Sequence, residues 1–235
     1  MRGQRVLAVD VGGSHVKLLV SGGGGEPRRF VSGPELAASE MVKRVAALTG
    51  DWSYDAVTVG VPAPVHAGHV VAEPVNLGSG WVGFDFEAAF DKPTKVINDA
   101  AMQALGSYEG GKMLFLGLGT GLGSALVVDG IVAPMELGHL PFRKATFEDY
   151  VGERGRKRLG KKKWRAAAAE AIERLTAALE PDYVVLGGGN AKKLGDLPTD
   201  VRLGANDNAF LGAFRLWDPT MPSLSSTEEA PIALR

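Results

Sequence analysis

The sequence predicts an α/β protein made of two similar halves around a central cleft. Segments typical of buried strands alternate with amphipathic helices, an order that favours an α/β fold. A strand, a tight glycine turn and a second strand occur near the N-terminus and recur near the middle of the chain. The 32 glycines among 235 residues exceed the usual share of roughly 7% and gather at the ends of predicted strands.

Apolar runs and their periodicity define the elements of the first half. Runs on either side of a glycine turn predict two strands joined as a hairpin. Leu36, Met41 and Val45 have the spacing of an amphipathic helix. The expected order is strand 5–10, strand 15–20, helix 35–49, strand 56–61, a small hairpin 65–72, strand 95–97 and a helix within 100–107.

The second half repeats the hairpin and adds further helices. We expect strands 112–118 and 124–128 around a second glycine turn, then an alanine-rich helix 164–179, strand 183–186 and a last helix 207–216. Residues 1–105 are assigned to an N-terminal lobe and residues 106–206 to a C-terminal lobe. The tail, residues 218–235, is rich in Pro, Ser and Thr without periodicity, so we expect it to be loose.

Composition excludes several classes of protein. With 45% hydrophobic and 23% charged residues, the chain can bury a core, which rules out disorder throughout. The absence of cysteine excludes disulfides, iron–sulfur clusters, cysteine-based zinc sites and thiol nucleophiles. A formal charge of -1 gives no general argument for nucleic-acid binding, and no signal peptide or membrane span is recognisable. We therefore expect a soluble, cytoplasmic protein that binds neither nucleic acid nor membrane.

The first glycine turn has the residues of an anion site. In DVGGSHVK, Asp10 ends a strand, Gly12 and Gly13 form the turn, and the hydroxyl of Ser14 and the ammonium of Lys17 follow. Glycine lets backbone N–H groups approach a phosphate closely, and a nearby lysine adds positive charge. The alternative is an ordinary hairpin turn. A Walker A loop is excluded because its Gly-x-x-x-x-Gly-Lys-[Ser/Thr] pattern is missing.

The second glycine turn, GLGTGLG at residues 117–123, contains Gly119, Thr120 and Gly121. Its glycines alternate without the G-x-G-x-x-G spacing, and a strand is expected to follow, which disfavours a Rossmann dinucleotide site. One such turn is a weak signal. Two turns in matching places, one in each half, predict a phosphorylated ligand between the halves.

Two further segments carry polar groups suited to chemistry. Asn98 and Asp99 lie between a short strand and a helix, where Asp commonly caps the helix; in a cleft beside two phosphate turns, Asp99 could instead accept the proton of an attacking hydroxyl. In ELGH, Glu136 and His139 could bind sugar hydroxyls, because a carboxylate accepts hydrogen bonds and an imidazole both donates and accepts them. The alternative for His139 is a polar residue satisfied by its surroundings.

A basic stretch follows. Residues 154–165 (RGRKRLGKKKWR) hold eight Lys or Arg and no acid. Such a run is commonly a solvated surface; the functional alternative is a track for a polyanion. Binding of nucleic acid here would need aromatic partners for the bases, and Trp164 is the one aromatic residue in the stretch.

Together these motifs resemble those of the ROK family of sugar kinases, within the actin-like ATPase (ribonuclease H-like) fold, and most closely its bacterial polyphosphate glucokinase branch. The resemblance covers residues 7–214, with the motifs in the family's order. DVGGSHVK resembles the first phosphate loop, with Ser14 in place of threonine, and GLGTGLGSALVVDG resembles the second. The G-x-P-G-x-V segment of the family is matched by VGVPAPV, and its sugar-contacting stretch by NLGSGW. The segment with the catalytic aspartate is matched by VINDAAMQALG, and the E-x-G-H sugar motif by ELGH. The nucleotide-side glycine loop resembles VVLGGGNAKK.

The resemblance implies transfer of a terminal phosphoryl group from polyphosphate, ATP or both to the 6-hydroxyl of glucose or a related hexose, with Mg²⁺ as cofactor. It makes Asp99 the catalytic base, and it makes Asp10 a residue that places Mg²⁺ through water. The residues that would bind the sugar are Asn76, Asn98, Glu136 and His139. Those that would bind the donor phosphates or nucleotide are Asp10, Gly12, Gly13, Ser14, Lys17, Gly119, Thr120, Gly121, Gly187, Gly188 and Gly189.

The departures from the family pattern also matter. Many ROK proteins bind zinc through cysteines after the E-x-G-H histidine; this chain has no cysteine, so we expect no zinc site. That absence agrees with the polyphosphate branch, for which the expected track is Lys161, Lys162, Lys163, Lys192 and Lys193. The family also implies a last helix, 207–217, that returns to the N-terminal lobe, and homodimers are common in it. Two alternatives stay open: an ATP-dependent kinase for another hexose, and a non-catalytic sugar-binding sensor.

Overall fold

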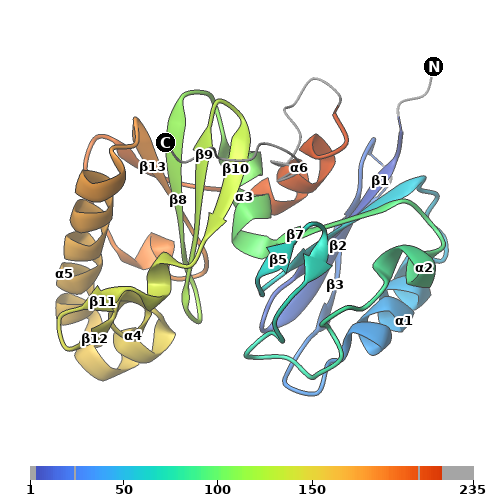
Figure 1. Ribbon diagram of the computed structural model, residues 1–235, viewed down its shortest axis with the longest axis horizontal. Helices are drawn as coiled ribbons and strands as arrows, with labels where there is room; N and C mark the ends of the chain where they lie inside the picture. The colour runs from blue at the N-terminus through green and yellow to red at the C-terminus, as the bar shows by residue number, and fades with distance from the viewer. Residues whose placement is uncertain (1–3, 24, 206, 219–235) are drawn as a thin grey trace, which may run out of the picture.

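Two five-stranded sheets with helices between and around them form the molecule (Figure 1). The structure is a computed structural model that describes residues 4–23, 25–205 and 207–218. It confirms the predicted α/β class, because parallel strands and helices alternate in both halves. The tail that we expect to be loose lies outside the described residues from position 219 onward.

The first sheet has the strand order β3-β2-β1-β4-β7. Its strands are β1 (Val6–Val11), β2 (His15–Val20), β3 (Arg28–Val31), β4 (Ala56–Val61) and β7 (Thr94–Asn98). The hairpin strands β1, β2 and β3 run antiparallel, whereas β1, β4 and β7 run parallel. Every residue of β1 and β4 is buried, as expected for parallel strands covered on both faces.

Helix α1 (Ala38–Thr49) and the short helix α2 (Phe86–Phe90) cover the outer face of this sheet (Figure 1). The prediction placed the start of α1 three residues too early. The reason is the carbonyl oxygen of Leu36, which accepts hydrogen bonds from Trp81 Nε1 and from the N–H of Gly78, both at 3.1 Å. That oxygen ties the chain to the loop after the small hairpin formed by β5 (Val65–His66) and β6 (His69–Val70).

The second sheet repeats the arrangement of the first, with the order β10-β9-β8-β13-β14. Its strands are β8 (Lys112–Leu118), β9 (Leu122–Val128), β10 (Ile131–Met135), β13 (Tyr183–Gly187) and β14 (Val201–Leu203). Again a three-stranded antiparallel meander continues into parallel strands. The predicted similarity of the two halves is therefore confirmed.

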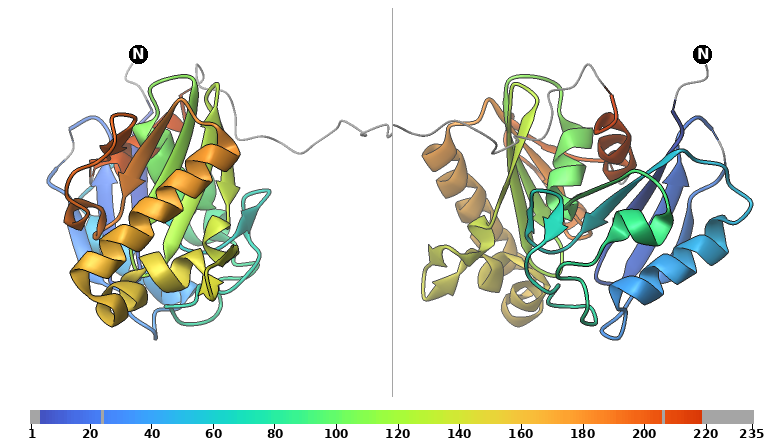
Figure 2. Two further views of the ribbon diagram at one scale, coloured as in Figure 1. Left: turned by 90° about the vertical axis from the view of Figure 1, so that its left-hand side faces the viewer. Right: turned by 45° about the vertical axis from the view of Figure 1, so that its right-hand side comes forward.

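The long helix α5 (Glu153–Leu179) covers the outer face of the second sheet (Figure 2). It begins well before the predicted residue 164, because the basic stretch is itself helical and has no apolar periodicity to reveal it. Gly160, at φ 72°, interrupts the helix, and Trp164 anchors it by donating from Nε1 to the carbonyl of Val151 at 2.8 Å. None of the described helices is long and apolar enough to cross a membrane.

Short elements connect β10 to α5 and β13 to β14. They are the 3₁₀ turn η1 (Leu137–His139), the hairpin of β11 (Pro141–Phe142) and β12 (Ala145–Thr146), helix α4 (Phe147–Val151) and the 3₁₀ turn η2 (Ala191–Lys193). Thr146 and Asp149 form a capping box at the start of α4.

Two helices, α3 (Asp99–Ser107) and α6 (Asn208–Arg215), lie between the sheets and share one apolar cluster with both (Figures 1 and 2). They cross in backbone contact: a Cβ on Gly106 would overlap the carbonyl oxygen of Asn208, and one on Gly212 would overlap that of Met102. Thr58 of β4 donates to the carbonyl of Ala213 at 2.9 Å, so α6 also contacts the first sheet.

The crossing gives a stability prediction. Gly106→Ala should lower the free energy of unfolding by about 3 kcal/mol, because overpacking against backbone cannot relax. Helix propensity alone predicts the opposite sign, since Ala is favoured over Gly within a helix. The control is Gly50→Ala, where the new Cβ would lie an ordinary 3.6 Å from the carbonyl of Ala46. Urea unfolding followed by circular dichroism measures both; equal midpoints for the two variants would contradict the prediction.

Candidate active site

The site is organised at the carboxyl ends of the parallel strands of the first sheet, an edge where α/β proteins commonly bind ligands. Asp10 lies near the end of β1 opposite Gly60 of β4, Asn98 ends β7, and Asp99 begins α3. A Cβ on Gly60 would overlap the side chain of Met102 in α3. Glycine at this position thus leaves room for Met102, and the Cα of Asp99 lies within ordinary contact of the same position, at 3.7 Å from such a Cβ.

Asn98, not Asp99, caps α3. Its Oδ1 accepts the N–H of Ala101 at 3.1 Å, and its Nδ2 donates to the carbonyl of Ala63 at 3.2 Å. Both ends of the buried amide are therefore engaged with the backbone. Asp99 does not cap the helix. Its Oδ1 accepts the N–H of the adjacent Ala100 at 2.8 Å, and its side chain is half-buried.

The surroundings of Asp99 make it a proton acceptor at neutral pH. Burial of the carboxyl group raises its pKa most; the negative charges of Asp10 and Glu136 raise it further, although the hydrogen bond from Ala100 opposes them. The pKa of Asp99 is about 7. A carboxyl group with that pKa is divided between its two protonation states near pH 7, the condition that suits general base catalysis.

Asp10 is buried at 5% exposure and is compensated by Lys17, the residue opposite it in the β1–β2 hairpin. Lys17 Nζ lies 3.0 Å from Asp10 Oδ2. Because a buried carboxylate without a partner is unfavourable, this pair supplies Asp10 with a partner of opposite charge. The side chain of Lys17 is also 47% exposed, so its ammonium can contact a ligand as well.

Hydrogen bonds within the hairpin and from Ser32 fix the first glycine turn. The N–H of Gly12 donates to the carbonyl of His15 at 3.0 Å, and the hydroxyl of Ser32 donates to the carbonyl of Gly12 at 2.7 Å. The N–H of Ser32 donates to the carbonyl of Ser14 at 3.1 Å. The residue after β3 thus fixes the turn, while the hydroxyl-bearing Ser14 stays exposed.

The second glycine turn, which joins β8 to β9, lies against α4 and the start of α5. Glu148 Oε2 accepts the N–H of Leu122 at 3.3 Å, and a Cβ on Gly121 would displace the Glu148 carboxylate from this position. The backbone N–H of Glu153, the first residue of α5, donates to the carbonyls of Gly119 and Thr120, both at 3.1 Å. The N-terminus of the long helix therefore lies directly against the turn.

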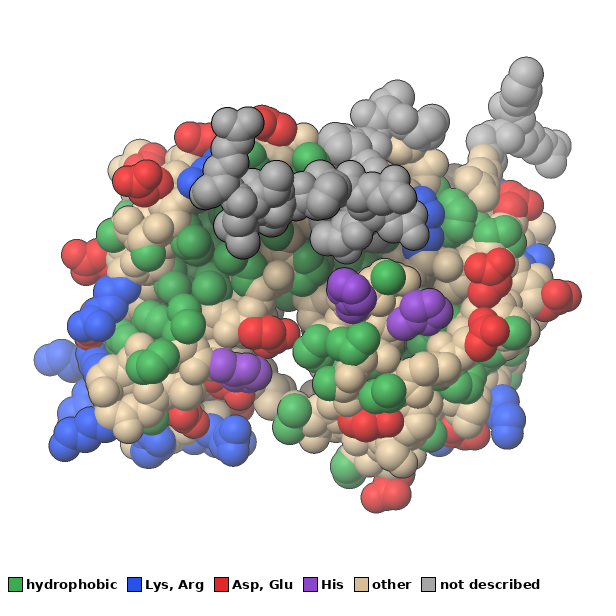
Figure 3. Space-filling model, in the orientation of Figure 1, with side chains coloured by type: hydrophobic (Ala, Val, Ile, Leu, Met, Phe, Trp, Pro, Cys, Tyr) green, Lys and Arg blue, Asp and Glu red, His purple; other side chains and the backbone are tan. Residues whose placement is uncertain are grey.

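The two glycine turns meet. A Cβ on Gly13 would lie 3.6 Å from the Cβ of Asn76 and 3.9 Å from Thr120 Oγ1. This contact joins the first turn, the predicted sugar loop and the second turn, which lie far apart in the sequence. The space-filling view shows the molecule hollowed between its two halves (Figure 3).

Glu136 precedes η1 and His139 is its last residue, on the second-sheet side, and both are exposed. Burial and the charge of Glu148 raise the pKa of Glu136, although His139 opposes the shift. The charge of Glu136 in turn raises the pKa of Asp99, so the two carboxyl groups lie within electrostatic range of each other.

The triple glycine, Gly187 to Gly189, ends β13 beside the second turn. Gly188 has φ +80°, and a Cβ on it would overlap the carbonyl of Leu118. Asn190, which follows, is buried and donates its backbone N–H to that same carbonyl at 2.9 Å. The predicted nucleotide-side glycines and the second phosphate turn are thus one continuous surface.

The structure divides the basic stretch into two parts. Arg154, Arg156 and Lys157 each form an ion pair with Glu148 or Glu153. Lys161, Lys162 and Lys163 are exposed and form no ion pair within the described part of the chain. Figure 3 shows Lys and Arg side chains gathered along the edge of the half that carries α4 and α5.

The Lys192 and Lys193 pair belongs to the same region. Arg165 Nε donates to the carbonyl of Lys193 at 2.7 Å, which connects α5 to η2. Lys192 is exposed, as is Lys193. The structure therefore brings together two basic segments that are separated in the sequence.

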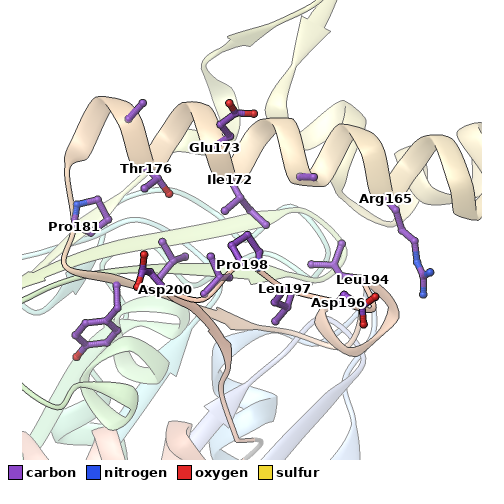
Figure 4. Close-up of a pocket in the computed structure, with 15 residues that line it drawn as sticks. Arg165, Ile172, Glu173, Thr176, Pro181, Leu194, Asp196, Leu197, Pro198 and Asp200 are labelled. Atoms are coloured by element: carbon purple, nitrogen blue, oxygen red, sulfur yellow. The ribbon is translucent and has the colours of Figure 1, made fainter.

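A second cavity, of about 570 Å³, lies between the later part of α5 and the segment from residue 194 to β14 (Figure 4). Ile172, Leu197 and Pro198 give it a mostly apolar lining, and Thr176 Oγ1 in its wall is buried with no hydrogen-bond partner among the described residues. None of the sequence-predicted site residues lines it. It is separate from the space around Asp99.

Within the described residues, no group of three or more His, Asp or Glu side chains is arranged to hold a metal ion. Mg²⁺ does not need such a cage, because it commonly binds through one or two carboxylates, water and substrate phosphates. The buried carboxylate of Asp10, placed between Asp99 and the first glycine turn, fits that mode of binding.

Several residues that shape the site were missed by the sequence analysis. Ser32 fastens the first turn, Glu148 and Asn190 fasten the second, and Glu73 accepts the N–H groups of residues 80, 81 and 82 in the loop after Asn76. Each acts through the backbone of a distant segment. No local pattern in the sequence could have indicated them.

The chain was compared with protein-family models, curated proteins and solved structures, and similar proteins were found among the solved structures. No protein-family model and no curated protein matches the chain. The polyphosphate/ATP-glucomannokinase of Arthrobacter sp. strain KM superposes with a TM-score of 0.78 at 24% identity, over 90% of this chain and 97% of that one. A ROK family glucokinase from Streptomyces griseus, solved with glucose and AMPPNP, has a TM-score of 0.73 at 16% identity, over 90% and 98%.

A ROK family transcriptional regulator, homologous to the E. coli MLC protein, is also similar, with a TM-score of 0.68 at 15% identity over 90% of this chain and 77% of that one. Sugar kinases and a regulator thus share this architecture. The chain has the two-sheet, actin-like ATPase fold of the ROK sugar kinases, as its motifs predict.

Proposed function

We propose that this protein is a sugar kinase that transfers a terminal phosphoryl group from polyphosphate, ATP or both to the 6-hydroxyl of glucose or a related hexose. The observation that carries the proposal is Asp99: a carboxyl group with a pKa of about 7, beside Asp10 and within electrostatic range of Glu136, where two glycine turns meet. Water exclusion, positioning and charge compensation are what phosphoryl transfer requires of a protein.

In the proposed reaction Asp99 takes the proton of the sugar hydroxyl. The hydroxyl oxygen forms a bond to the terminal phosphorus of the donor, and the bond from that phosphorus to its bridging oxygen breaks. The products are the sugar phosphate and either ADP or a polyphosphate shortened by one unit. Asn98 acts through Asp99, because its buried amide fixes the first turn of α3.

The two glycine turns would hold the donor phosphates through their N–H groups, with Ser14, Thr120 and Lys17 adding hydroxyls and a positive charge. Mg²⁺, when bound, would neutralise part of the phosphate charge. Asp10 would hold it through water, consistent with its burial close to Asp99.

Asn76, Glu136 and His139 would orient the sugar. Asn76 lies beside Gly13, and Glu136 acts electrostatically on Asp99 from the second-sheet side, so both can reach a hexose in front of Asp99. Closure of the two lobes on the sugar would exclude water as a competing acceptor.

Polyphosphate is favoured as one donor by Lys161, Lys162 and Lys163, which are exposed and form no ion pair among the described residues. They follow Gly160 in α5, whose first residue lies against the second turn. The similar Arthrobacter enzyme is described as acting with inorganic polyphosphate or ATP. If the basic surface has no such role, the chain would be a kinase that uses ATP alone.

A sugar-binding sensor is the second candidate, favoured by the similarity to a transcriptional regulator. A coupled assay for glucose 6-phosphate, with polyphosphate and ATP supplied in turn, distinguishes the candidates. Turnover with either donor supports the kinase. Hexose binding without turnover on any hexose tested would support the sensor instead.

Asp99→Asn should lower kcat by about 10² to 10⁴-fold, because the amide cannot accept the proton. The control is the pH dependence of the free energy of unfolding. The pKa of the Asp99 carboxyl group is about 7 in the folded chain and about 4 in the unfolded chain. Its ionisation therefore destabilises the wild type between about pH 4 and 7, so the variant should gain relative stability as pH rises. Wild-type kcat in the variant would refute the assignment.

The pH profile of the wild type gives a separate prediction. Because deprotonated Asp99 is the base, kcat/KM should fall about tenfold for each pH unit below about 7. Conservative replacement of Asp10 by Asn removes the neighbouring negative charge, so the acidic limb of the profile should move to lower pH. An unshifted limb in Asp10→Asn would show that another group titrates.

Replacing Lys161, Lys162 and Lys163 together by Met should raise the KM for long polyphosphate more than the KM for ATP, since a chain of phosphates extends along the helix. Added salt should raise the polyphosphate KM of the wild type and have a smaller effect on the variant. A polyphosphate KM that responds neither to salt nor to the substitutions would show that this surface does not bind the donor.

A further inference from the structure

Three consecutive carbonyl oxygens of the second glycine turn, at residues 118 to 120, are bonded by two residues behind the turn. Asn190 donates its backbone N–H to Leu118 at 2.9 Å and its side-chain Nδ2 to Gly119 at 3.2 Å. The N–H of Glu153 donates to Gly119 and Thr120, both at 3.1 Å. The oxygen-bearing side of the turn is therefore fastened to the segment after β13 and to the start of α5.

Peptide geometry then decides where the N–H groups point. The described residues contain no cis peptide bond, and across a trans peptide the N–H points opposite to the carbonyl. The N–H groups of Thr120 and Gly121 consequently point away from Asn190 and Glu153. The side chain of Thr120 lies beside Gly13, so the opposite side of the turn is the one that faces the first glycine turn.

The side chain of Asn190 has one orientation in this network. Lys193 Nζ donates to Asn190 Oδ1 at 2.6 Å, and because an ammonium group can only donate, the amide NH₂ must face Gly119. The same NH₂ also donates to Glu153 Oε2 at 3.0 Å. Asn190 is only 4% exposed, so water has little access to replace these bonds.

Glu153 is itself held in its charged form. Hydrogen bonds from Arg156 at 2.7 and 2.6 Å lower the pKa of Glu153 to about 2, with Asn190 adding to the shift. The carboxylate therefore remains an acceptor for the Asn190 amide across the whole working range of pH. Lys193 and Arg156 thus stabilise the network from its two ends.

We propose that Asn190 is a positioning residue for the phosphoryl donor. Lys193 acts through Asn190 and does not bind the donor together with Lys161, Lys162 and Lys163 of α5. The side chain of Asn190 holds the carbonyl oxygen of Gly119 away from the donor and so presents the N–H of Thr120 to its phosphates. The N–H of Glu153 does the same for the carbonyl of Thr120 and thus for the N–H of Gly121. The inference rests on the proposed function, which it deepens: it applies to any phosphate donor, ATP and polyphosphate alike.

The test uses the full chain and two readouts. Calorimetric binding of inorganic tripolyphosphate and of AMPPNP, both with Mg²⁺, measures the donor site without turnover; kcat and KM with ATP measure catalysis. Asn190→Ala should weaken binding of both anions about tenfold or more and lower kcat/KM by about 100-fold, the loss expected for a misplaced binding group, while the hexose Kd stays unchanged. Lys43→Met, on the exposed side of α1, is the control for removal of one positive charge.

A double-mutant cycle decides the role of Lys193. If Lys193 acts through Asn190, Lys193→Met should weaken AMPPNP binding in the wild-type background and add nothing in the Asn190→Ala background. Full additivity of the two substitutions would overturn this role and would assign Lys193 to direct contact with the donor.

Asn190→Asp is a second variant, which keeps the test decisive if Asn190→Ala fails to fold. It keeps the side-chain size and an acceptor for Lys193 but, when ionised, has no group that can donate to Gly119, so the same loss of anion binding is expected. Unchanged anion binding in folded Asn190→Asp and Asn190→Ala would overturn the inference. If the wild type binds both anions and the variants do not, yet no hexose is phosphorylated, the inference stands and the proposed function alone fails.

Discussion

The site depends on one unfavourable arrangement: the carboxyl group of Asp99 is held partly out of water next to the buried carboxylate of Asp10. The fold tolerates it because Lys17 neutralises Asp10 from the neighbouring strand and because Asn98, not Asp99, caps α3. The result is a base with a pKa of about 7. Two carboxylates in separate solvated positions would not have this property.

The position of Asp99 relative to both sheets depends in turn on α3. This helix lies between the sheets and crosses α6 with backbone in contact at Gly106 and Gly212, and Ala100 meets Gly123 of β9. Contacts this close leave little freedom for sliding, so α3 is a rigid reference for the acid at its start. The first sheet supplies Asp10, the second supplies the turn with Thr120, and α3 determines how far apart they lie.

The positive charges of α5 fall into two groups according to their distance from the second glycine turn. The acids of α4 and the start of α5 neutralise Arg154, Arg156 and Lys157, which lie next to the second glycine turn. Farther along α5, Lys161, Lys162 and Lys163 have no ion-pair partner within residues 4–23, 25–205 and 207–218. Close to the turn, positive charge stabilises the protein's own carboxylates. A count of charges along the sequence does not make this distinction.

The sequence by itself determined the α/β class, the two similar halves, both glycine turns and the candidate base, because buried strands, glycine turns and family motifs are local patterns. It misplaced the starts of α1 and α5, where a carbonyl bonded to Trp81 and a helix of charged residues leave no local signal. Only the tertiary structure decided that Asn98 is the cap, that Lys17 pairs with Asp10, and that Asn190 supports Gly119. Those roles come from hydrogen bonds and charges between segments that meet only when the strands pair and the two sheets close on α3.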